Sequence, residues 1–199
     1  MPTGRNQRAD ATRNRELLLA AAEEEFTEKG LDASVADIAR RAGVAKGTIF
    51  RHFATKEDLI AAIVSGHFAA LIAIAERLLT ASDPGAALLQ LLTETADNIR
   101  QNDLLFLQSI TGNDSRVLAL RDELHATITA LVTKAQEAKA IRPDLTGTDV
   151  FALMCTPVHA VDFLPNPSPD SWKRYLAIIF DGFRPEGATA LPVAAPDWG

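Results

Sequence analysis

The sequence predicts an all-α fold with about nine helices. Alanine and leucine dominate, whereas strand-favouring residues are sparse: aromatic side chains make up 6% of the chain and there is one tyrosine. Apolar residues recur at helical spacing, and glycines and prolines stand between the periodic segments. Hydrophobic residues at 47% and charged residues at 23% are ordinary values for a folded domain and exclude a disordered chain.

The first helix is predicted over residues 10–29. Leu18, Ala22 and Phe26 recur at intervals of four, so they lie on one stripe of this helix. Gly30 follows as the stop, because glycine readily takes the left-handed conformation that ends many helices.

Two short helices are predicted next, over residues 34–42 and 45–52. Ser34 and Asp37 have the spacing of a capping box, in which side chains satisfy the unpaired N–H groups of a helix start. Gly43 stands in the turn between the two helices, where it can take a positive φ without strain. The apolar residues expected to face inward are Val35, Ile38, Ala39, Val44, Ile49 and Phe53.

Longer amphipathic segments follow. Thr55 and Asp58 form a second capping box at the start of a long helix, in which Gly66 marks either a close helix contact or a soft point. Pro157 is expected to bend the helix that contains it. The helices are predicted over residues 56–79, 84–100, 103–111, 114–140, 147–163 and 168–183, and residues 184–199 are expected to form a disordered tail.

The net charge of −6 is unevenly distributed along the chain. Residues 1–60 hold ten basic and ten acidic side chains, so the whole acidic surplus lies in residues 61–199. Within residues 37–56, five basic side chains accompany one acid. A locally basic end on an acidic body favours an oriented approach to a polyanion, and the alternative is a solvated surface of mixed charge.

Helices with a glycine turn between the second and the third are typical of a helix-turn-helix unit, whose third helix enters the major groove of DNA. Gly47 allows close approach of the backbone, and Thr48 can contact a base edge or a thymine methyl. We expect Lys46 and Thr48 to read sequence, and Ser34, His52 and Lys56 to hold phosphates. The complete set of expected DNA contacts is Ser34, Lys46, Gly47, Thr48, Phe50, Arg51, His52 and Lys56.

The run SVADIARRAGVAKGTIFRHFATKEDLI at residues 34–60, preceded by LLLAAAEEEFTEKGLDA, resembles the tetracycline-repressor (TetR) family of bacterial regulators. The resemblance implies an all-helical homodimer, with a DNA-binding domain at residues 1–55 and a ligand-binding and dimerisation domain at residues 56–183. Three positions depart from the family pattern. Ala45 replaces a helix cap, Phe50 replaces a tyrosine whose hydroxyl reaches a phosphate, and Glu25 stands where an apolar residue is common.

The resemblance further implies a one-component regulator, most simply a repressor, that binds a palindromic operator and responds to an unidentified small-molecule effector. Apolar residues at helical spacing in the second domain are mostly core, and a few are expected to line the effector pocket. The expected pocket residues are Phe68, Phe106, His125, Met154 and His159. Dimerisation is expected through the apolar helices at 147–163 and 168–183, which can form a four-helix seam.

Other functions find less support in the sequence. Cys155, His159 and Asp162 would share a helix face and could bind a transition metal. A small hydrophobe, a capped histidine and a surface acid near a dimer seam are the favoured interpretation, so no metal or other cofactor is expected. No catalytic motif is present. An all-helical enzyme therefore stays an alternative for which the sequence offers no catalytic site. A DNA-binding architectural protein without an effector is the other alternative, and the acidic second domain counts against it.

The cellular location also follows from composition. The single cysteine excludes an intramolecular disulfide and fits a reducing compartment. No uninterrupted apolar run reaches the roughly 18 residues of a membrane span, and the basic start is not followed by an apolar stretch of signal-peptide type. We expect a cytoplasmic protein that is neither exported nor embedded in a membrane.

Overall fold

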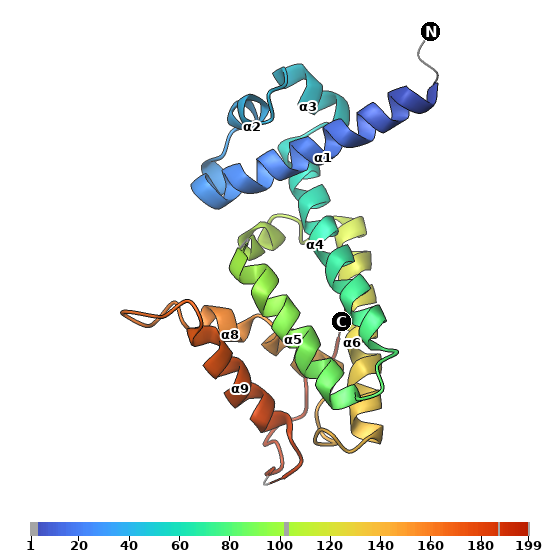
Figure 1. Cartoon of the computed structure of the whole chain (residues 1–199), viewed down its shortest axis with the longest axis vertical. Coiled ribbons are helices and arrows are strands. Elements are labelled where there is room, and N and C mark those ends of the chain that lie inside the picture. Colours follow the sequence, from blue (N-terminus) through green and yellow to red (C-terminus); the bar gives the residue numbers. More distant parts are fainter. Residues whose placement is uncertain (1–3, 102–103, 187, 199) are drawn as a thin grey trace. The chain divides into compact units, whose positions relative to one another are not determined.

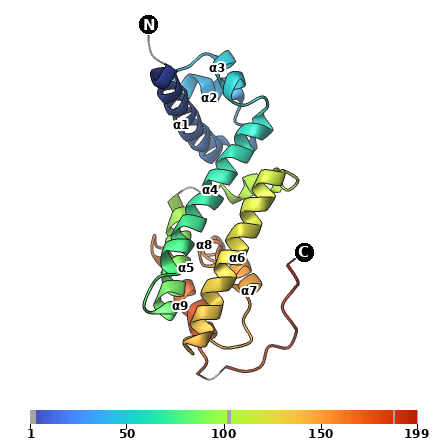
Figure 2. The ribbon, with the colours of Figure 1, turned by 90° about the vertical axis from the view of Figure 1, so that its right-hand side faces the viewer.

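The computed structural model describes residues 4–101, 104–186 and 188–198, and every regular element in these ranges is a helix, which confirms the all-α prediction (Figures 1 and 2). The α-helices are α1 (Gly4–Lys29), α2 (Val35–Arg41), α3 (Lys46–His52), α4 (Lys56–Leu78), α5 (Pro84–Gln101), α6 (Ser115–Glu137), α7 (Gly147–Leu153), α8 (Thr156–His159) and α9 (Ser171–Phe183). Two 3-10 helices, η1 (Gly30–Asp32) and η2 (Leu105–Ser109), complete the set.

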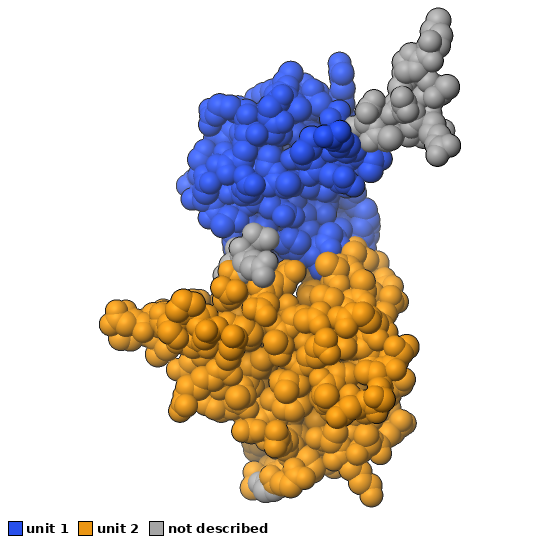
Figure 3. Space-filling model, viewed as in Figure 1, with its two compact units in different colours: residues 1–67, 102–118 blue, residues 68–101, 119–199 orange. Residues whose placement is uncertain are grey.

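The chain forms two compact units (Figure 3). Unit 1 comprises residues 1–67 and 102–118, and unit 2 comprises residues 68–101 and 119–199. The division falls inside α4, so unit 1 extends well beyond residues 1–55, the predicted DNA-binding domain.

Unit 1 is built around the apolar stripe of α1. Leu18, Ala22 and Phe26 are completely buried, as their spacing predicts. Ile38 of α2 and Ile49 of α3 are also buried. Each short helix is therefore stabilised by the burial of an apolar side chain and not by its internal hydrogen bonds alone. Helices this short are not stable alone, and their position therefore depends on the packing of α2 against α1 and of α3 against α2.

The predicted turns of unit 1 are confirmed. Gly30 has φ +56° and Gly43 has φ +69°, both in the left-handed region that favours glycine. Thr55 and Asp58 form the complete capping box at the start of α4: the Thr55 N–H donates to Asp58 over 3.2 Å, and the Asp58 N–H donates to the Thr55 hydroxyl over 3.0 Å.

Unit 2 packs α5, α8 and α9 against one another. The face of α9 that points inward is apolar and carries Trp172, Leu176, Phe180 and Phe183, all less than a tenth exposed. Thr146 and Asp149 form a capping box at the start of α7. Beyond Phe183, the described residues form neither helix nor strand.

The prediction of one helix over residues 147–163 is wrong. The first helix there ends at Leu153, and α8 starts anew at Thr156 with Pro157 in its first turn. Proline costs no hydrogen bond in a first turn, because the N–H groups there have no partner in the helix. Pro157 therefore starts a second helix instead of bending a continuous one.

Other helix boundaries also differ from the prediction: α1 starts at Gly4 rather than at residue 10, and α6 ends at Glu137 rather than at residue 140. Within residues 103–111, the structure has only the 3-10 helix η2, and residue 103 lies outside the described residues. The last helix starts at Ser171 rather than at 168, with Asp170 as its N-cap. The Ser168 N–H instead donates to the Ser171 hydroxyl over 2.9 Å, which fixes the turn that precedes α9.

Helix α4 is long and apolar enough to span a membrane by length and composition alone. Its apolar side chains are nevertheless used inside the protein: Leu59 and Ile63 are buried in unit 1, and Ile72 is buried in unit 2. This burial is what a core helix shows. Gly66 is exposed, and a Cβ built there would meet no atom within 4 Å, so close packing does not explain this glycine.

Two glycines provide matched tests of this packing. A Cβ at Gly147 would lie 2.0 Å from Thr129 Oγ1 and 2.9 Å from Thr129 Cα, so Gly147→Ala must displace α7 from α6. We expect this substitution to destabilise the protein by about 1–3 kcal/mol. Gly66→Ala has open space and a helical backbone, so it should stabilise by about 1 kcal/mol. Urea unfolding of both variants measures the difference, and equal midpoints would contradict the packing described.

Candidate DNA-binding surface

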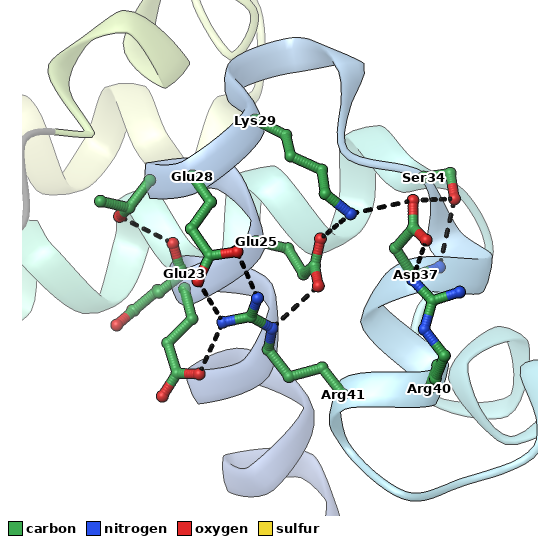
Figure 4. Close-up of polar contacts among 10 residues, drawn as sticks. Glu23, Glu25, Glu28, Lys29, Ser34, Asp37, Arg40 and Arg41 are labelled. Atoms are coloured by element: carbon green, nitrogen blue, oxygen red, sulfur yellow. Dashed lines mark hydrogen bonds and ion pairs between the residues drawn. The ribbon is translucent and has the colours of Figure 1, made fainter.

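The position of α2 is fixed by a polar network that joins it to α1 (Figure 4). Arg41, the last residue of α2, donates from Nε to Glu25 over 2.8 Å and from Nη1 to Glu24 over 3.0 Å. It also donates two hydrogen bonds to Glu28. One guanidinium therefore binds three carboxylates of α1, two on adjacent residues and one a turn further on, using the planar array of donors that only arginine has.

Glu25 is the buried member of the network, with an exposed fraction of 3%. Lys29 contacts its carboxylate at 2.7 Å, on the opposite side from Arg41. Burial of a charge is costly unless the charge is paired, and here two cations pair it. This explains why a glutamate is tolerated at a position where an apolar residue is common.

Lys29 connects this network to the start of α2. Its Nζ lies 3.4 Å from Asp37, which also accepts a hydrogen bond from the Ser34 hydroxyl over 2.8 Å. The Asp37 N–H donates in turn to the Ser34 oxygen over 3.1 Å, so the predicted N-cap of α2 is confirmed. Both ends of α2 are thus attached to α1 or capped by neighbouring side chains.

The network keeps its carboxylates charged. Hydrogen bonds from Ser34, and then from Arg40, lower the pKa of Asp37 to about 2. The pKa of Glu25 is lowered chiefly by its hydrogen bond with Lys29, and that of Glu28 by its hydrogen bond with Arg41. The pKa of Arg41 is raised by the same contacts, so the ion pairs persist at neutral pH.

One face of helix α3 is exposed to solvent. Lys46, Gly47, Phe50 and Arg51 are exposed, whereas Ile49 is buried. No atom lies within 4 Å of a Cβ built at Gly47, so the backbone is open to an approaching surface. Thr48 and His52 lie at the border of this face and are half-buried. The predicted pattern of inward and outward residues on α3 is therefore observed.

The start of α3 lacks a side-chain cap, because its N-cap residue is Ala45. An alanine at this position forgoes about 1 kcal/mol of capping. Lys46 lies 6.0 Å from the centre of the Phe50 ring, one turn further on, and this cation–π contact orients the lysine along the helix.

Some of the basic side chains near α3 already have partners within unit 1. Arg41 is bound to α1, and Arg40 is paired with Asp37. Lys46 and Arg51 form no ion pair with any residue that the structure describes. These two cations are therefore available to a polyanion without loss of an internal ion pair.

Two predicted phosphate contacts have internal partners. The hydroxyl of Ser34 donates its one proton to Asp37, so only the backbone N–H groups of this helix start remain as donors. Lys56 donates to the carbonyl oxygen of Leu31 over 2.7 Å and lies 5.5 Å from the centre of the Phe26 ring. An ammonium group has three donors, so Lys56 keeps two N–H groups for another acceptor.

Arg15 is a residue that the sequence analysis did not single out. Its guanidinium lies 5.2 Å from the centre of the Phe53 ring, and Arg15, His52 and Phe53 line the same hollow on unit 1. The available signal was its place among the arginines at positions 5, 8, 13 and 15, but only the fold brings it next to the end of α3.

The predicted effector residues are divided between the two units. Phe106 belongs to unit 1, whereas Phe68, His125, Met154 and His159 belong to unit 2. Phe68 and Met154 are buried, and His125 and His159 are half-buried. The hollow of about 310 Å³ between α5 and α9 is lined by none of them.

Cys155, His159 and Asp162 do not share one helix, because Cys155 precedes α8 and Asp162 follows it. His159 Nδ1 lies 3.3 Å from Asp162. Among the residues that the structure describes, no cluster of three or more histidine, cysteine or acidic side chains is arranged to hold a metal ion.

The network predicts an acid-sensitive unit 1. Carboxyl groups with lowered pKa contribute stability that is complete above their unfolded-state values, ordinarily 4.5 for glutamate. This contribution is lost as the pH falls through the folded-state values, of which that of Asp37 is about 2. We expect Arg41→Met to lower the midpoint of thermal unfolding at pH 7 and to flatten the decline below about pH 4.5, because it removes the arginine whose hydrogen bonds lower the pKa of Glu28 and contribute to that of Glu25.

Arg77→Met is the control for this prediction. Arg77 pairs with Glu94 in unit 2, but its side chain is 54% exposed, and exposed pairs contribute little. Circular dichroism melts at each pH compare the two variants. Equal effects of the two substitutions would show that the α1–α2 network has no special role in stability.

The comparisons with known proteins agree with this geometry. The model for "Bacterial regulatory proteins, tetR family" matches residues 18–63, and the model for "Transcriptional regulator SbtR-like, C-terminal domain" matches residues 83–185. The second match alone covers more than half of the chain.

Sequence relatives match a limited stretch of this chain. The HTH-type transcriptional repressor Rv3405c of Mycobacterium tuberculosis is 45% identical over 65 residues, which is 32% of this chain and 31% of that protein. The HTH-type transcriptional repressor BepR of Brucella suis is 41% identical over 61 residues, which is 30% of this chain and 29% of that protein. The chain thus matches about a third of the length of these relatives.

Solved structures match along most of the chain. The TetR transcriptional regulator SCO0520 from Streptomyces coelicolor is 31% identical, with a TM-score of 0.61 over 87% of this chain and 99% of that one. The TetR transcription regulatory protein from Mycobacterium vanbaalenii is 29% identical, with a TM-score of 0.64 over 89% of this chain and 99% of that one. The helix-turn-helix geometry, the two family matches and these structures lead to one conclusion: the chain belongs to the TetR family of bacterial transcriptional regulators.

Proposed function

We propose that this protein is a one-component transcriptional repressor, which binds a palindromic operator as a homodimer and leaves it when a small-molecule effector binds. The observation that carries the proposal is the face of α3, which is buried on one side through Ile49 and offers Lys46, Gly47 and Arg51 to solvent on the other. Regulators of this family bind DNA as dimers and respond to small molecules. Because such a protein acts on chromosomal DNA, the proposal places it in the cytoplasm.

Each α3 enters a major groove, where Lys46 and Thr48 contact base edges. A lysine can reach the acceptors of guanine, and a threonine can contact a thymine methyl group. Gly47 lets the helix approach closely because it has no side chain. The two half-sites lie about 34–36 Å apart or a multiple of this distance, which is the spacing of successive major grooves on one side of DNA.

Phosphate contacts position α3 on the duplex. Arg51 and His52 lie at the end of α3, and Arg15 lies beside them on α1. The N–H groups at the start of α2, behind Ser34, and the remaining donors of Lys56 bind further phosphates. Phe50 contributes an apolar contact with the sugar–phosphate backbone, since it has no hydroxyl to donate.

Dimerisation uses the outward face of α9. Trp172, Leu176 and Phe180 are committed to the core of unit 2, so they do not form the seam. Ile178 is 55% exposed, and Tyr175 and Ile179 are half-buried beside it. Ile178, together with α7 and α8, provides the apolar surface that an interface between two copies related by a two-fold axis needs.

The effector site is assigned to unit 2, where apolar side chains surround a few polar groups. Phe68, Met154, His125 and His159 remain the proposed lining residues there, whereas Phe106 belongs to unit 1 and is not assigned to this site. Gly66 is the proposed soft point of α4: its exposed position favours flexibility over packing. The effector would release DNA because it binds the arrangement that cannot bind DNA more tightly than the arrangement that can. Such a difference in binding free energy is typically about 1–3 kcal/mol.

The roles on α3 predict distinct mutant phenotypes. Thr48→Ala should change the preference at one base pair by about 1–3 kcal/mol, because it removes a base contact. Arg51→Ala should weaken binding to all sequences alike and reduce the salt slope by about one ion. The measurements are fluorescence anisotropy titrations with duplexes that the wild-type protein selects from a random-sequence pool. An Arg51→Ala variant with altered base preference and an intact salt slope would reverse the assigned roles.

The seam on α9 predicts the oligomeric state of two variants. Ile178→Glu should convert the dimer to a monomer, because it places a charge in the apolar contact. Ala177→Glu adds the same charge at an exposed position about 100° around the helix and should leave the dimer intact. Sedimentation equilibrium distinguishes the species, and a dimeric Ile178→Glu protein would place the seam elsewhere.

A further inference from the structure

The segment that follows α9 is attached to unit 2 at two places. At the first, Arg142 donates its backbone N–H to the carbonyl oxygen of Phe183 over 2.8 Å and a guanidinium N–H to the carbonyl oxygen of Thr189. Asp144 binds the same guanidinium in two hydrogen bonds of 2.6 and 2.8 Å. Arg142 is 8% exposed, so a buried and paired charge secures the start of the segment.

At the second place, the ring of Trp198 lies among side chains of α6 and α7. It stacks on the His125 ring with 3.8 Å between centroids and 7° between planes. The Phe151 ring meets it edge-on, at 4.8 Å and 72°. Figure 2 shows the C-terminal segment beside α6 and α7 of unit 2.

Polar groups complete the surroundings of this ring. The Trp198 Nε1–H donates to Asp122 over 3.1 Å, and the Arg121 guanidinium lies 5.0 Å from the ring centre. His125 Nε2 lies 3.1 Å from the hydroxyl of Thr148, which fixes the imidazole in the plane that stacks. Burial lowers the pKa of His125, so its ring is neutral at pH 7.

The contacts with His125, Phe151, Arg121 and Asp122 all involve the indole ring of Trp198 and not its backbone. One partner covers the face, one meets the edge, one supplies a cation, and one accepts a ring N–H. No hydrogen bond to the backbone of residues 195–197 is needed to form them. Any molecule with the same features could make the same contacts.

We propose that His125, Phe151, Arg121 and Asp122 form a binding site for a planar aromatic ring that carries an N–H donor, with Trp198 as its resident occupant. The chemical class of the ligand is that of indole. Because Thr189 is held by Arg142, a short stretch of chain keeps Trp198 near the site. A short tether gives an effective concentration in the millimolar range, so a free ligand must displace Trp198 to bind.

The test is the binding of indole, measured by isothermal titration calorimetry on the full-length chain without DNA. Removing the resident ring in Trp198→Ala should create one site per chain, with affinity for indole on the order of tenfold or more above that of the wild type. Adding His125→Ala to Trp198→Ala should abolish this site, since the stacking partner is lost. In Trp198→Ala, 1-methylindole should bind more weakly than indole, because it cannot donate to Asp122.

Two further variants keep the result interpretable. Trp198→Phe retains an aromatic ring without the N–H and should give an intermediate affinity for indole. Arg77→Ala in the Trp198→Ala background removes an exposed arginine of unit 2 that is distant in sequence from Arg121 and should not change indole binding. Circular dichroism confirms that each variant is folded.

Equal indole binding by the wild type and Trp198→Ala would overturn the proposal, as would no binding by Trp198→Ala or binding that survives His125→Ala. Since no DNA is present, these outcomes do not depend on the proposed repressor function.

Discussion

The surface that we assign to DNA depends on one interaction, the binding of Arg41 to the carboxylates of α1. Helices α2 and α3 have seven residues each, too short to hold their conformation or direction alone. Apolar burial through Ile38 and Ile49 accompanies the packing of α2 on α1 and of α3 on α2, but apolar contacts are not directional. The Arg41 guanidinium fixes the orientation of α2, because it must pair with the buried carboxylate of Glu25, where an unpaired charge is costly.

The same interaction explains how an acidic protein presents a basic face. The positive charges near α3 are divided between two tasks. Arg41 and Arg40 neutralise carboxylates within unit 1, and Lys56 holds the carbonyl of Leu31. Lys46 and Arg51 carry the charge that faces outward. The net charge of −6 therefore says little about the partner, whereas the local pairing says which side chains a phosphate can reach.

Features that depend on neighbours in sequence were predictable, and those that depend on distant partners were not. The stripe of α1, the positive φ of Gly43 and the Thr55–Asp58 capping box follow from spacings of a few residues. Glu25 finds its partner 16 residues away, and Trp198 finds Asp122 76 residues away. The start of α8 was missed because Pro157 fits both a bend and a first turn, and only packing decides between them.

The central claim is that Arg41 serves the fold of the DNA-binding surface and does not touch DNA. The most direct measurement is the affinity of Arg41→Met for an operator duplex as a function of salt concentration, at a temperature where circular dichroism shows the variant folded. The account predicts weaker binding with an unchanged slope of log affinity against log salt, since no phosphate contact is lost. A slope reduced by about one ion would show that Arg41 binds a phosphate itself and would contradict the account.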